Sequence, residues 1–136
     1  MTADTYLLQI RKWGLQIKNR RRDYALWRDK ADGYGGSSSG DRVQATRNLH
    51  RGADAIGNYI DIERDIERLM AKRDKAIGII ESLPKDEYIV LYAFYVDGKL
   101  LKTIALDEGR SYRWVEAKKS RGLALVQKMI DAEGLT

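Results

Sequence analysis

The chain has 136 residues, of which 43% are apolar and none is cysteine. This composition is typical of a globular protein, and the lack of thiols excludes disulfides, thiolate metal sites and a cysteine nucleophile. No apolar run reaches the roughly 18 residues that cross a bilayer, and Asp4 precedes any apolar segment, unlike in a signal peptide. The sequence therefore predicts a soluble cytoplasmic protein that does not contact a membrane and uses no cofactor or metal.

The net charge of +5 is distributed unevenly. Residues 110–121 hold five cations against Glu116 alone, which gives a local charge of +4 within a nearly neutral C-terminal segment. Such a basic element favours a polyanionic partner, because neutralising phosphates releases counterions and drives binding. The five cations are Arg110, Arg113, Lys118, Lys119 and Arg121.

Two long helices are predicted in the first two-thirds of the chain. The first spans about Asp4 to Lys30 and the second about Ala53 to Leu83, and each carries an apolar seam at alternating steps of four and three. Arg20 and Arg73 occupy the one position in each seam that is not apolar. The seam residues are Tyr6, Ile10, Trp13, Ile17, Tyr24 and Trp27 in the first helix, and Tyr59, Ile62, Ile66, Leu69, Ala76, Ile80 and Leu83 in the second.

A glycine- and serine-rich stretch at about 33–48 separates the two helices and predicts a flexible loop. Helices of this length need to bury their seams, and the simplest solution is an antiparallel helical hairpin of residues 1–83, resembling a coiled coil. An intermolecular coiled coil, for example in a homodimer, remains the alternative.

A separate domain is predicted for residues 84–136. Pro84 ends the second helix, and the segment Asp86–Val96 is apolar nearly all round, which is typical of a buried central helix. Asp97 and Gly98 then end this helix.

The following residues have the spacing of a helix-turn-helix. Ala105 leaves room for the crossing helix, Gly109 takes the turn, and Val115 packs the second helix back. Ser111 is the predicted N-cap of that helix, which begins at Tyr112. Glu108 and Lys118 depart from the pattern, because apolar residues are usual at both positions.

The predicted DNA-binding residues cluster around this second helix. Those near its N-terminus face base edges in the major groove of double-stranded DNA, and the others contact phosphates. Base contacts are assigned to Tyr112, Arg113 and Trp114, with Glu116 and Lys119 as further candidates, and phosphate contacts to Arg110, Lys118 and Arg121; Ser111 completes the set.

The C-terminal module resembles region four of bacterial sigma factors, from Leu83-Pro84 through Gly109 to Val115. The whole chain resembles the ArpU-like family of small phage and prophage late transcriptional regulators, which share an Arg-Val-Gln element after a Gly/Ser break. In this chain that element is Arg42-Val43-Gln44. The resemblance implies binding to phage promoter DNA, control of late genes and contact with host RNA polymerase.

Two other functions fit the same pattern. A DNA-packaging accessory similar to a small terminase subunit, or a recombination accessory, also combines helical elements with DNA binding, and a structural coiled-coil adaptor needs only the hairpin. No phosphate-binding glycine loop, metal-ligand cluster or nucleophile-and-base spacing occurs, so catalytic residues are not expected.

Overall fold

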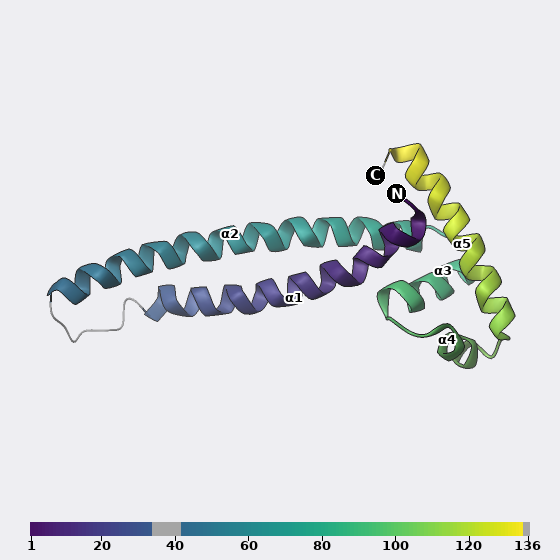
Figure 1. The fold of residues 1–136 in the computed structure, drawn as a ribbon, viewed down its shortest axis with the longest axis horizontal. Coiled ribbons are helices and arrows are strands. Elements are labelled where there is room, and N and C mark those ends of the chain that lie inside the picture. Colours follow the sequence, from purple (N-terminus) through teal and green to yellow (C-terminus); the bar gives the residue numbers. More distant parts are fainter. Residues whose placement is uncertain (34–41, 135–136) are drawn as a thin grey trace. The chain divides into compact units, whose positions relative to one another are not determined.

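The structure is a computed structural model that describes the backbone of residues 1–33 and 42–134 and the side chains of residues 1–30, 57–58 and 60–134. Every regular element in these residues is helical, which confirms the predicted all-α class (Figure 1). No helix among them is both long enough and apolar enough to cross a membrane. The elements are α1 (Ala3–Gly33), α2 (Arg42–Glu81), α3 (Lys85–Leu91), the short π-helix η2 (Tyr92–Val96), α4 (Leu101–Glu108) and α5 (Tyr112–Glu133).

Helix α1 agrees with its predicted range, whereas α2 begins earlier than predicted. It starts at Arg42 rather than near Ala53, so Arg42-Val43-Gln44 and the second half of the predicted loop are helical. Residues 42–52 contain no proline and one glycine, and nothing in their backbone chemistry stops a helix. The rest of the predicted loop, residues 34–41, lies outside the described residues.

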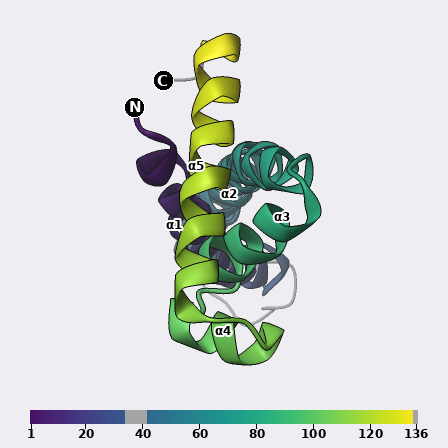
Figure 2. The same cartoon turned by 90° about the vertical axis from the view of Figure 1, so that its right-hand side faces the viewer.

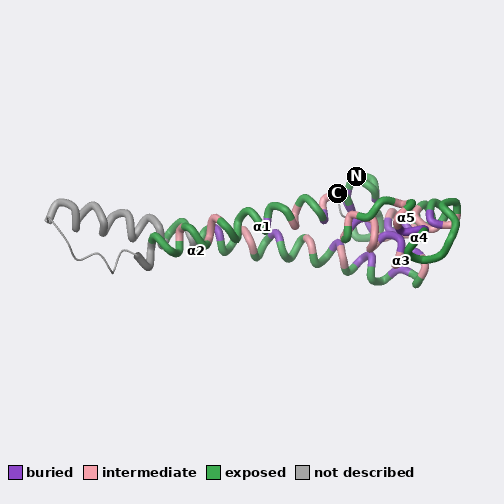
Figure 3. Tube along the Cα trace, turned by 90° about the horizontal axis from the view of Figure 1, so that it is seen from below, coloured by how far each residue is buried: buried purple, intermediate pink, exposed green. Residues whose placement is uncertain are grey.

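The chain divides into two compact units, which differ from the predicted division at residue 84. Unit 1 comprises residues 1–14 and 71–136, and unit 2 comprises residues 15–70. The first part of α1 and the last part of α2 belong with the C-terminal helices because they share one apolar core with them. Most of the buried residues lie in unit 1, and Figure 3 shows buried segments concentrated around α3, α4 and α5. This core includes Leu7, Ile10, Ile79, Ile80, Leu91, Tyr95, Val126 and Ile130.

Tyr95 links η2 to the start of α1 inside this core. Its side chain is 1% exposed, and its hydroxyl donates a hydrogen bond to Asp4 Oδ1 at 2.5 Å. Burial raises the pKa of Tyr95, and the hydrogen bond to the Asp4 carboxylate raises it further. The N-terminus of α1 is also held to α5, since the Ala3 N–H donates to Gln127 Oε1 at 2.7 Å.

A second, smaller apolar cluster lies under α4 and the start of α5. It consists of Val90, Ile104, Ala105 and Val115, with Trp114 and Phe94 among the partly buried side chains packed against it. Helix α5 contacts both α3 and α4 (Figure 2). The predicted packing roles of Ala105 and Val115 are therefore confirmed, since these residues are 7% and 0% exposed.

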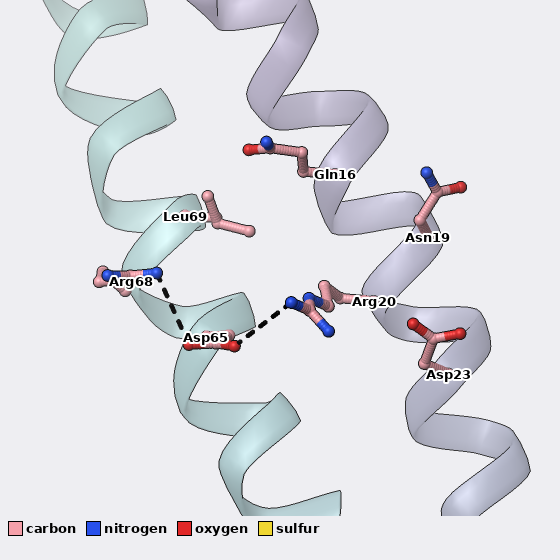
Figure 4. A pocket seen from close by; sticks show the side chains of 7 residues that line it. All are labelled: Gln16, Asn19, Arg20, Asp23, Asp65, Arg68 and Leu69. Atoms are coloured by element: carbon pink, nitrogen blue, oxygen red, sulfur yellow. Dashed lines mark ion pairs between the residues drawn. The ribbon is translucent and has the colours of Figure 1, made fainter.

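Unit 2 pairs a segment of α1 with a segment of α2. Ile17, Ile62 and Leu69 are buried, as the seams predicted. Arg20, which interrupts the first seam, points at Asp65 of α2, with 3.8 Å between Nη2 and Oδ2 (Figure 4). The charged residue that interrupts the first seam therefore forms an ion pair between the two helices.

The other interruption, Arg73, lies in unit 1 and rests against a glycine. A Cβ placed on Gly14 would lie 3.3 Å from Arg73 Nε, so the glycine provides the space that the guanidinium occupies. Arg73 Nε is buried without a hydrogen-bond partner among the described residues. The pairing of Gly14 with Arg73 explains how a cation fits a seam position.

Candidate nucleic-acid interface

The turn between α4 and α5 follows directly from its sequence. Gly109 adopts φ 62° and ψ 34°, the left-handed conformation that glycine enters without steric cost. The Arg110 N–H donates to the Ala105 carbonyl at 3.0 Å and the Gly109 N–H to the Leu106 carbonyl at 3.3 Å. These two bonds form a Schellman motif, which ends α4 and sets the direction in which the chain leaves it.

Ser111 is the N-cap of α5, as predicted. Its backbone is extended, with φ −71° and ψ 154°, and its Oγ accepts a hydrogen bond from the Trp114 N–H at 3.1 Å. Helix α5 begins at the next residue, Tyr112. One residue therefore separates the turn glycine from the cap, and the N-terminus of α5 follows α4 almost immediately.

An exposed group of side chains surrounds the N-terminus of α5. Arg110, Tyr112, Arg113 and Glu116 are all exposed, and Tyr112 has 49% of its surface accessible. Within the described residues Arg113 makes no ion pair and no side-chain hydrogen bond. The donors of its guanidinium are therefore not used by other described residues.

Trp114 serves mainly in packing. Its ring lies against the second apolar cluster, and the Arg110 guanidinium lies over it at 4.9 Å from the ring centroid. This contact positions Arg110 next to the N-terminus of α5. Trp114 was predicted to contact bases, but its ring packs within the domain and beneath Arg110.

Three further cations of α5, Lys118, Lys119 and Arg121, contact side chains of the same domain. The Lys119 ammonium lies 4.1 Å from the centroid of the Phe94 ring. Lys118 Nζ lies 3.7 Å from Glu87 Oε1 and 3.9 Å from Asp86 Oδ2, and Arg121 Nε lies 3.5 Å from Glu87 Oε1. The structure thus separates the predicted cations into two at the N-terminus of α5 that have no acidic partner among the described residues and three further along the helix that contact side chains of the domain. Of these three, Arg121 stays largely exposed.

These contacts explain both departures from the motif. Lys118 occupies an inward helix position because a buried carboxylate, Glu87, which is 3% exposed, needs a cation beside it. Glu108 is exposed in the last turn of α4, where a charged side chain costs little. Neither residue disturbs the packing around Ala105 and Val115.

The acidic residues of α3 were missed by the sequence interpretation. A carboxylate inside the apolar segment that begins at Asp86 was a signal for a buried ion pair, and Lys118 at an inward position was its complement. Only the fold shows that the two meet, because they lie far apart in the sequence.

A hollow of about 310 Å³ in unit 2 is a second candidate site. Its charged walls are largely paired, because Asp65 contacts both Arg20 and Arg68 (Figure 4). The side chains that line it offer no nucleophile beside a base, and the described residues contain no cluster of three or more His, Cys, Asp or Glu that could hold a metal ion. Comparison of the chain with models of protein families, with curated proteins and with solved structures finds no match.

Proposed function

We propose that this protein binds double-stranded DNA through a helix-turn-helix formed by α4 and α5, and that it regulates transcription. The observation that carries the proposal is the exposed, unpaired Arg113 in the first turn of a capped helix that follows a tight glycine turn. In DNA-binding helix-turn-helix proteins the N-terminal residues of the second helix reach the base edges of the major groove.

The division of the cations supports this orientation. Arg110 and Arg113 are exposed at the N-terminus of α5, whereas Lys118 and Lys119 point toward α3 and η2. A duplex approaching α5 from its N-terminal end meets two arginines, the hydroxyl of Tyr112 and the positive end of the helix dipole. Arginine is the side chain that most often recognises guanine in the major groove.

The resemblance to small phage regulators extends the proposal to late promoters and host RNA polymerase. In this proposal α1 and α2 form an antiparallel hairpin that contacts another protein, while α4 and α5 hold DNA. The pairing of Arg20 with Asp65 in unit 2 and of Gly14 with Arg73 in unit 1 agrees with antiparallel helices. The wide polar faces of both helices leave room for such a partner.

The direct test compares two cation-removing variants on duplex fragments selected from the genome that encodes the protein. Arg113→Ala is expected to weaken binding to the selected fragment by about 1 to 3 kcal/mol and binding to a shuffled duplex much less. The matched control is Lys128→Ala, which removes an exposed cation from the same helix about 22 Å further along. It should leave the preference for the selected fragment unchanged.

Equal losses on selected and shuffled duplexes for Arg113→Ala would show that Arg113 does not read bases. Selection that recovers no fragment at low salt would contradict DNA binding itself. Fragments that fall at promoters of late genes support transcriptional regulation, whereas enrichment at a packaging site favours the packaging accessory.

A further inference from the structure

Two carboxylates of α3 lie against the basic side of α5. Glu87 contacts both Lys118 and Arg121, at 3.7 and 3.5 Å, and Asp86 lies 3.9 Å from Lys118. The Glu87 side chain is 3% exposed, while that of Asp86 is 47% exposed. One carboxylate is therefore part of the interior and the other faces solvent beside the same lysine.

A glycine in α5 makes this approach geometrically feasible. A Cβ placed on Gly122 would lie 2.8 Å from Leu91 Cδ1 and 3.4 Å from Glu87 Cβ. Helix α3 thus packs directly on the backbone of α5, and Glu87 is held between the side chains of Lys118 and Arg121. A carboxylate at this depth is tolerated because two cations compensate its charge.

The pairing changes the charge that DNA would meet. Residues 110–121 carry a local charge of +4 by sequence, and the carboxylates of Asp86 and Glu87 lower it to +2. The side chain of Lys118 is 23% exposed, and its charge is compensated by the two carboxylates beside it. Arg121 stays 68% exposed but shares its charge with Glu87. Arg110 and Arg113, near the start of the helix, have no such acidic partner among the described residues.

We propose that the acidic pair of α3 determines the selectivity of the DNA interface by withholding Lys118 and Arg121 from phosphates. Binding that depends on charge alone is thereby weakened, because fewer counterions are released when any duplex is bound. The contacts of Arg110 and Arg113 then account for a larger share of the binding energy. This inference rests on the proposed DNA binding and adds the residues that suppress binding to unrelated sequences.

Asp86→Asn tests the inference with little risk to the fold, because its carboxylate is half exposed and pairs only at the surface. The variant is expected to bind a short random-sequence duplex about two- to fivefold more tightly at low salt, the range of one exposed charge pair. The slope of log K against log salt should become steeper by up to about one unit, because Lys118 keeps only Glu87 as an acidic partner and its charge is less compensated.

The matched control is Glu81→Gln, which removes the same charge from an exposed position in the last turn of α2. Glu81 makes no ion pair within the described part of the chain. Its replacement should leave both the affinity for random duplex and the salt slope close to those of the native protein. A second variant, Glu87→Gln, should also bind random duplex more tightly, and its helix content is checked by circular dichroism.

The outcomes separate this inference from the proposed function. If the native protein binds duplex DNA and Asp86→Asn binds no more tightly than Glu81→Gln, the acidic pair does not control selectivity, although DNA binding stands. Weaker binding by Asp86→Asn would likewise overturn the inference. If neither the native protein nor Asp86→Asn binds any duplex at about 50 mM salt, the proposed function fails as well.

Discussion

Tyr95 makes the stability of the folded protein depend on pH in the alkaline range. Its phenol is neutral in the folded protein because burial and the Asp4 carboxylate both oppose its ionisation, so its pKa is raised above the ordinary value of 10.0. In the unfolded chain the phenol ionises near that ordinary value. The unfolded state therefore releases a proton above pH 10 that the folded state retains, and stability falls as pH rises from there. Below pH 10 the contribution of Tyr95 is fully present.

Tyr95→Phe provides the test at the residue scale. At neutral pH the variant should lose about 1 to 2 kcal/mol of unfolding free energy, because the hydrogen bond to a charged acceptor is removed. Between about pH 9 and 11 its stability should fall less steeply than that of the native protein. Some fall remains, since burial also raises the pKa of Tyr6, with Glu133 adding to the effect.

Urea unfolding at a series of pH values measures both effects. Tyr112→Phe is the control, because the Tyr112 phenol is exposed and has no hydrogen-bond partner among the described residues. It should match the native protein at every pH. Parallel pH curves for Tyr95→Phe and the native protein would contradict the assigned role of Tyr95.

At the scale of the elements, the contact between α3 and α5 determines where the acidic pair lies. Gly122→Ala should destabilise the protein by about 1 to 3 kcal/mol, because the added methyl group would lie 2.8 Å from Cδ1 of the fully buried Leu91, which would have to shift within the core. The close approach of the two helices, and with it the pairing of Glu87, depends on this glycine.

Gly78→Ala is the matched change at an open position. Gly78 is exposed within α2 and a Cβ there would meet nothing within 4 Å. Alanine is the better helix former, so this variant should gain up to about 1 kcal/mol. Thermal and urea unfolding compare the two variants, and a stabilised Gly122→Ala protein would mean that α3 does not approach α5 as closely as described.

The buried faces of α1 and α2 were only partly predictable from the sequence. The seams of α1 and α2 were predictable because a period of three and four residues reports one buried face. Leu7 and Ile79 lie off these seams and are nevertheless buried, because in unit 1 each long helix is covered on a second side by the C-terminal elements. Periodicity within one helix carries no information about that second partner.

In the candidate site, too, the local features were predictable and the long-range contact was not. Gly109 and Ser111 were predictable because a left-handed turn and an N-cap are local chemistry, determined within a few residues. The pairing of Glu87 with Lys118 was not predictable, since it joins α3 to α5, which are separated in the chain by η2, α4 and two connecting segments. The start of α2 at Arg42 was not predictable, because the cluster of glycines and serines at 33–40 does not by itself indicate where the following helix begins.

At the scale of the whole molecule, the two units present different surfaces. Unit 1 presents the N-terminus of α5 with its exposed arginines, and unit 2 presents long polar helix surfaces and the ion pair of Arg20 with Asp65. The proposal assigns DNA to the first and a protein partner to the second. DNA binding is the central claim, because the regulatory role and the selectivity of the acidic pair both depend on it.

The most direct measurement of that claim is the affinity of the native protein for a labelled duplex, followed by fluorescence anisotropy between about 50 and 200 mM salt. Each neutralised phosphate contributes about −0.9 to the slope of log K against log salt, so the phosphate contact assigned to Arg110 predicts saturable binding with a slope of about −1 or steeper. Absence of saturable binding at the lowest salt, or an affinity that does not change with salt, would contradict the account.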